Sequence, residues 1–101
     1  LALSPEKEQI RLESLLKIFF GYNMEVDVTI KHIKDMEENF KLQTAVLKSI
    51  IKEIEGYRDE NHSHIFPMLT AEYGLIYYEA CLKWAEKDID KLEKVKKGEL
   101  K

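Results

Sequence analysis

Several residue types that chemistry and nucleic-acid binding commonly use are scarce in this chain of 101 residues. Its one cysteine, Cys81, excludes an internal disulfide and is typical of a reducing compartment, so we expect a cytoplasmic location. Only Arg11 and Arg58 are arginines, and the net charge is -3, whereas a domain that neutralises many backbone phosphates is normally basic. The chain by itself is therefore a poor nucleic-acid binder.

The sequence also lacks a signal peptide and a long hydrophobic run. Its longest uninterrupted apolar stretches cover a few residues, whereas a membrane-spanning helix needs about 20. We therefore expect no membrane partner. With 45% hydrophobic residues, no internal repeat and no strand pattern, the chain is predicted to form one all-α domain with a modest core.

The helix predicted over residues 69–95 confines its polar residues to one narrow strip. That strip consists of Glu72, Glu79, Lys83, Glu86 and Asp90. The apolar residues form two stripes that are more than a right angle apart. The first stripe is Tyr73, Ile76, Tyr77, Ala80 and Trp84, and the second is Leu75, Tyr78, Leu82, Ala85, Ile89 and Leu92. A surface helix normally buries about a third of its circumference, so this helix needs cover on two sides.

A first helix is predicted between Ser4 and Phe20. Ser4 offers a capping hydroxyl, Pro5 suits the first helical position, and Gly21 ends the helix. Its last turns are apolar nearly all round. Phe19 and Phe20 therefore present more apolar surface than a single neighbouring helix covers.

A second, longer helix is predicted over residues 24–57, with Asn23 as its cap. Its key positions recur at strict intervals of three and four, which is the pattern of a coiled-coil seam. They are Ile33, Met36, Phe40, Gln43, Leu47, Ile50, Ile54 and Tyr57. Such a helix is about 50 Å long, whereas a compact domain of this size has a radius of gyration of about 13 Å. The sequence therefore predicts an elongated molecule.

These elements predict one short and two long antiparallel helices, coiled-coil-like, with the fold completed by homodimerisation. The loop between the long helices is about ten residues, so they pair antiparallel. The short helix cannot cover the remaining stripe of the last helix, and a second copy would. The alternative is a three-helix monomer in which each of these residues belongs to its own chain's core. The predicted shared surface consists of Leu16, Phe19, Phe20, Tyr73, Ile76, Tyr77, Ala80 and Trp84.

Residue types that bind metals gather in the loop between the long helices. Two histidines two positions apart, with no cysteine and no fixed third ligand, favour a solvated loop over a metal site. The cluster consists of Asp59, Glu60, His62 and His64. His32, between two lysines, is expected to be exposed. Neither the paired histidine-carboxylate motifs of a di-metal bundle nor paired arginines for an anionic substrate occur. We therefore expect no enzyme activity, no metal and no cofactor.

Three motifs then occur in a fixed order along the chain. They are Phe-Phe-Gly at 19–21, Tyr-Gly at 73–74, and Trp84 ten residues after Gly74. In this order and spacing, the chain resembles over residues 10–92 the C-terminal domain of PadR-like transcriptional regulators of the virulence activator alpha type. The resemblance implies that residues 1–101 are a C-terminal dimerisation or effector domain. It also implies a winged helix DNA-binding domain upstream of Leu1, through which DNA is contacted.

Two other functions stay open. Many members of the resembled family respond to small, often aromatic molecules, so the domain is alternatively an effector sensor. The predicted slot for such a ligand is formed by Tyr73, Tyr77, Tyr78 and Trp84. The second alternative is an unrelated helical interaction adaptor, which would be a monomer that pairs with a different protein.

Overall fold

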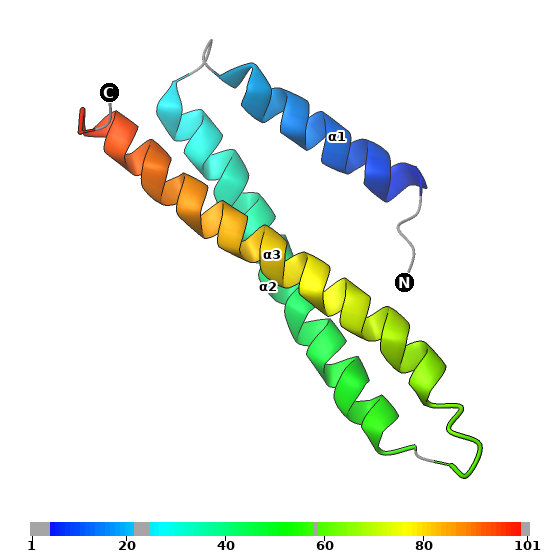
Figure 1. Cartoon of the computed structure of the whole chain (residues 1–101). Helices are drawn as coiled ribbons and strands as arrows, with labels where there is room; N and C mark the ends of the chain where they lie inside the picture. The colour runs from blue at the N-terminus through cyan, green and yellow to red at the C-terminus, as the bar shows by residue number, and fades with distance from the viewer. Residues whose placement is uncertain (1–4, 22–24, 58, 100–101) are drawn as a thin grey trace.

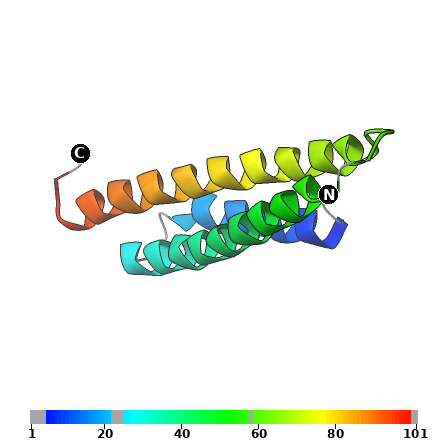
Figure 2. The ribbon, with the colours of Figure 1, turned by 90° about the horizontal axis from the view of Figure 1, so that it is seen from below.

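A computed structural model describes residues 5–21, 25–57 and 59–99. These residues form three helices and no strand: α1 (Pro5–Phe19), α2 (Val26–Glu55) and α3 (Ile65–Lys96). α2 and α3 make a long antiparallel hairpin, and α1 lies beside it (Figure 1). Seen from below, α1 and α2 lie on the same side of α3 (Figure 2). The predicted all-α fold of one short and two long helices is confirmed.

α1 begins at Pro5 and ends at Phe19, close to the predicted bounds. The predicted cap, Ser4, lies outside the described residues. After the helix, Gly21 lies against Thr29 of α2, and a Cβ atom at Gly21 would stand 2.9 Å from Thr29 Oγ1. The absence of a side chain at Gly21 therefore allows the end of α1 to lie close to the start of α2.

α2 ends two residues earlier than predicted. Its last residue is Glu55, and the N–H of Gly56 donates to the carbonyl of Glu53 at 3.1 Å. Tyr57, predicted as the last seam residue, lies beyond the helix and is 72% exposed. The prediction was wrong for Tyr57 because the seam pattern continues one step past the end of the helix. The predicted cap, Asn23, lies outside the described residues.

α3 begins at Ile65, before the predicted start at residue 69. Pro67 is the third residue of the helix, where a backbone N–H would have no partner within the helix. The proline therefore costs no hydrogen bond and does not mark the boundary. At the other end, the N–H of Lys97 donates to the carbonyl of Glu93 at 3.1 Å.

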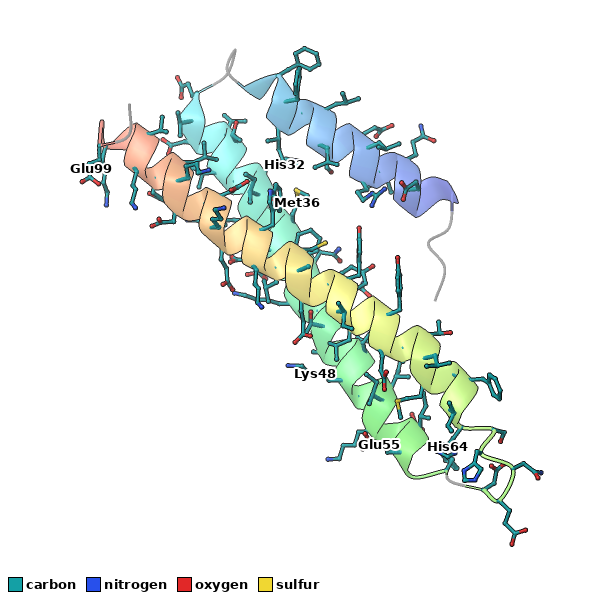
Figure 3. All side chains as sticks on the ribbon, viewed as in Figure 1. His32, Met36, Lys48, Glu55, His64 and Glu99 are labelled. Atoms are coloured by element: carbon teal, nitrogen blue, oxygen red, sulfur yellow. The ribbon has the colours of Figure 1, made fainter. Side chains whose placement is uncertain are left out.

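The core of the molecule is the seam between α2 and α3. Ile33 and Leu47 from the predicted seam are only 1% and 2% exposed, and Ala85 of the second α3 stripe is fully buried. The buried residues are Thr29, Ile30, Ile33, Thr44, Leu47, Ala71, Gly74 and Ala85. Small residues on α3 let the two helices approach closely. Charged residues such as Lys48 and Glu55 lie on the outer side of α2 (Figure 3).

The molecule is elongated, as predicted. Its radius of gyration is 17.5 Å and its extents are 60 × 27 × 17 Å. The accessible surface is 7841 Å², about 2,000 Å² more than a compact monomer of this mass exposes. Within the described residues, no helix is both long and apolar enough to cross a membrane.

We predict that Leu47→Ala lowers the free energy of unfolding by about 2–5 kcal/mol, because it leaves a cavity in the seam. Leu42→Ala on the same helix is the matched control, because Leu42 is 60% exposed. It should change stability by less than about 0.5 kcal/mol. Urea unfolding followed by circular dichroism at one protein concentration measures both. Equal losses in the two variants would show that the seam is not the core.

Candidate functional site

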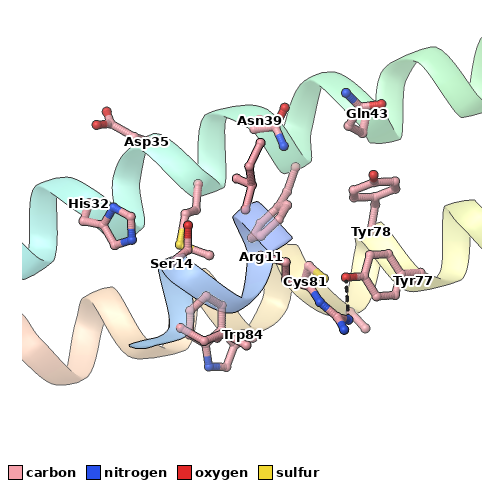
Figure 4. Close-up of a pocket in the computed structure, with 15 residues that line it drawn as sticks. Arg11, Ser14, His32, Asp35, Asn39, Gln43, Tyr77, Tyr78, Cys81 and Trp84 are labelled. Atoms are coloured by element: carbon pink, nitrogen blue, oxygen red, sulfur yellow. Dashed lines mark hydrogen bonds between the residues drawn. The ribbon is translucent and has the colours of Figure 1, made fainter. Parts of the chain in front are cut away.

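A groove opens between α1 and the α2–α3 hairpin. It has a volume of about 760 Å³ and is lined by side chains from residues 10–15 of α1, 32–43 of α2 and 77–84 of α3. The lining is mainly apolar. Figure 4 shows His32 near one end of this three-helix groove and Tyr77 and Tyr78 near the other. Because α2 and α3 run antiparallel, Trp84 lies toward the His32 end.

Arg11 links α1 to the hairpin. Its Nη1 donates a hydrogen bond to the Tyr77 hydroxyl at 3.3 Å, and its Nη2 is paired with the Glu8 carboxylate. Contact with Tyr77, and secondarily with Glu8, raises the pKa of Arg11 above its ordinary value. Among the described residues, this is the one side-chain hydrogen bond between α1 and α3. α1 therefore packs loosely on the hairpin, with the groove between them.

Aromatic rings form one end of the groove. The rings of Tyr77 and Tyr78 pack edge to face with centroids 5.1 Å apart, and the Tyr78 ring lies 6.3 Å from that of Phe40 on α2. Such pairs add about 0.5–1.5 kcal/mol beyond the burial of their area. Burial raises the pKa of the Tyr78 hydroxyl, and the neighbouring Tyr77 and Cys81 add to the shift.

Cys81 lies half-buried in the groove wall. Burial raises the pKa of its thiol, and the Tyr77 hydroxyl and the charge of Arg11 oppose that shift only in part. Because the thiolate is the reactive form, Cys81 is less reactive at neutral pH than an exposed cysteine. This favours a role for Cys81 as a small packing residue of the groove wall.

His32 was expected to be exposed, and this prediction was wrong. The residue is half-buried in the groove, and its Nε2 is buried without a hydrogen-bond partner. His32 shares one face of α2 with Met36 and Asn39, at helical spacing, and α1 covers that face. The helical spacing of His32, Met36 and Asn39 can be read from the sequence. The lysines on either side of His32 favoured an exposed position instead.

The structure divides the predicted shared surface between two places. Leu16 and Phe19 on α1, Phe20 just after it, and Tyr73 and Ile76 on α3 are 51–72% exposed. Tyr77, Ala80 and Trp84 line the three-helix groove instead. None of the eight residues is buried in the core of its own chain. The surface left open therefore lies along α1 and the first turns of α3.

The predicted ligand slot coincides with the groove in part. Tyr77, Tyr78 and Trp84 line the groove, whereas Tyr73 is outside the lining and exposed. Arg11, Ser14 and His32 also line the groove but lie outside the predicted slot. The position of α1 against the hairpin brings them there.

The histidine loop between α2 and α3 is held by a local turn. The backbone N–H of Ser63 donates to Asp59 Oδ1 at 2.9 Å, and the Ser63 hydroxyl donates to the other carboxylate oxygen. These hydrogen bonds lower the pKa of Asp59. The rings of His62 and His64 are 6.2 Å apart. In the part of the chain that the structure describes, no three His, Cys, Asp or Glu side chains are grouped to hold a metal ion.

We predict that iodoacetamide alkylates Cys81 more slowly than it alkylates a free cysteine peptide at pH 8.5, because burial raises the thiol pKa. Raising the pH through the thiol pKa should speed the reaction, and unfolding in guanidinium should bring the rate to that of the peptide. Mass spectrometry of the alkylated chain gives the rate. A native rate equal to or above that of the peptide would contradict this assignment.

Comparison with protein families gives one match. The family described as virulence activator alpha C-term matches residues 10–93, which include α2 and most of α1 and α3. Searches of curated proteins and of solved structures find no match. The matched segment contains the α2–α3 seam and the whole lining of the groove. This chain therefore belongs to the virulence activator alpha C-terminal family.

Proposed function

We propose that this chain is the dimerisation domain of a PadR-like transcriptional regulator, in which winged helix domains preceding α1 contact DNA. One observation carries the proposal. The apolar side chains of the predicted shared surface on α1 and early α3 stay exposed in the single chain. Monomeric soluble proteins rarely expose contiguous apolar patches of more than a few hundred square ångströms.

The exposed area supports a second copy as the partner. The chain exposes about 2,000 Å² more than a compact monomer of its mass, whereas a stable interface covers about 800 Å² on each partner. A two-fold dimer covers the same patch on both chains, so one surface is enough. Part of the excess reflects the elongated shape.

The dimensions support the role in spacing DNA-binding domains. Operator half-sites lie about 34 Å apart along the duplex, and the molecule is 60 Å long. A rigid dimer of such hairpins would hold two reading domains at a fixed separation, so that binding of one makes binding of the second nearly intramolecular. The net charge of -3 is consistent with DNA contact being left to the preceding domains.

In this proposal the domain acts by assembly and not by catalysis, and it works in the cytoplasm with Cys81 reduced. The alternative of an interaction adaptor predicts a monomer in solution. Measuring the molar mass of the purified chain therefore separates the two functions directly.

We predict that the chain scatters light with the mass of two copies and that Ile76→Glu reduces this to the mass of one. Ile76 is 68% exposed in the single chain, so a charge there disrupts a shared surface without entering the core. Helicity measured by circular dichroism should stay unchanged.

Leu42→Glu is the matched control, since Leu42 is similarly exposed but lies on α2, outside the predicted shared surface. This variant should keep the mass of two copies. A native chain with the mass of one copy at every concentration tested would refute dimerisation. Equal dissociation of both variants would place the interface elsewhere.

A further inference from the structure

We propose that the three-helix groove binds an amphipathic monocarboxylate with an extended hydrocarbon tail. Arg11 holds the carboxylate at the Tyr77 end, and the tail runs along the apolar lining toward Trp84. This site goes beyond dimerisation, because its lining lies within one chain.

The polar end of the proposed ligand follows from the hydrogen bonds of Arg11. A guanidinium has five N–H donors in a planar fork that matches a carboxylate. Nη2 of Arg11 is paired with the Glu8 carboxylate, and Nη1 donates a long hydrogen bond to the neutral Tyr77 hydroxyl at 3.3 Å. Nε is buried without a hydrogen-bond partner. The Arg11 side chain is 40% exposed, and each Nη has a second N–H beyond these bonds, from which a second carboxylate would accept.

The other charged or titratable groups in the groove do not compete for this role. Asp35 also lines the groove, but its carboxylate is paired with Lys31 at 3.3 Å, on the exposed side of α2. His32 lies toward the opposite end, with Trp84 (Figure 4). Arg11 is therefore the cation in the groove lining at the Tyr77 end.

The shape and the lining indicate the apolar part of the ligand. His32 and Gln43, both in the lining, are eleven positions apart on α2, which corresponds to about 16 Å along a helix. Between these positions the lining includes Met36, Phe40 and Leu15. A single-ring acid would fill a small part of 760 Å³ and would leave apolar walls without contacts. An extended hydrocarbon chain covers the length of the groove.

The test uses the fluorescence of Trp84, the one tryptophan of the chain. We expect decanoate, below its micelle concentration, to change Trp84 emission saturably. Dodecanoate should bind more tightly, by about three- to fourfold for each further buried methylene. Decyltrimethylammonium and 1-decanol test the head group, and 3-(4-hydroxyphenyl)propanoate tests whether an aromatic acid serves instead.

Variants locate the carboxylate. Arg11→Gln should weaken decanoate binding at least tenfold, because a charge-assisted hydrogen bond is lost, and Arg11→Lys should restore part of it. Lys17→Gln is the matched control, since it removes the same charge from α1 outside the groove lining. Bound decanoate should also slow alkylation of Cys81, which places the ligand in the groove.

Three results would overturn the proposal. They are equal binding of decanoate, decyltrimethylammonium and 1-decanol by the native chain, tighter binding of the aromatic acid than of decanoate, and unchanged alkylation of Cys81 at saturation. The first measures head-group preference without any variant, so it decides even if Arg11→Gln disturbs folding. The molar mass measured in the same samples reports dimerisation independently, so the failure of one proposal is distinguishable from that of the other.

Discussion

The structure depends on the pairing of α2 with α3 along one seam. A hairpin of two helices buries one face of each helix and leaves the others for a further partner. The most deeply buried side chains are Ile33 and Leu47 of α2 and Ala85 of α3. This seam fixes the rod shape of the domain, and the rod shape leaves the apolar side chains of α1 and early α3 uncovered.

α1 has two different sides because of this geometry. One side carries Arg11, Ser14 and Leu15 into the three-helix groove. The other carries Leu16 and Phe19, which are exposed in the single chain. In the proposed dimer, α1 therefore contributes side chains both to the ligand groove and to the shared surface. A ligand that changes the position of α1 would therefore change dimer affinity, and dimerisation would change ligand affinity by the same factor.

Periodicity in the sequence predicted the parts of the fold that depend on a single helix. Of the residues at intervals of three and four, Ile33 and Leu47 are buried in the seam with α3, whereas Met36, Phe40 and Gln43 line the groove. Ala85, on the second predicted stripe of α3, is fully buried. The groove was predicted only in part. Tyr77, Tyr78 and Trp84 were included, but Arg11 and His32 line the groove because of where α1 docks. That position depends on contacts between distant segments, which periodicity within one helix does not contain.

Gly21 lies against Thr29 of α2 just after the end of α1. A Cβ atom there would come within 2.9 Å of the threonine hydroxyl, so a side chain at Gly21 would require Thr29 or the neighbouring backbone to shift. α1 extends about 22 Å from this contact. A small change in the angle of α1 would therefore displace Ile10 more than it displaces the end of the helix near Gly21. The close approach of the chain to α2 at one end of α1 thus rests on the lack of a single methyl group at Gly21.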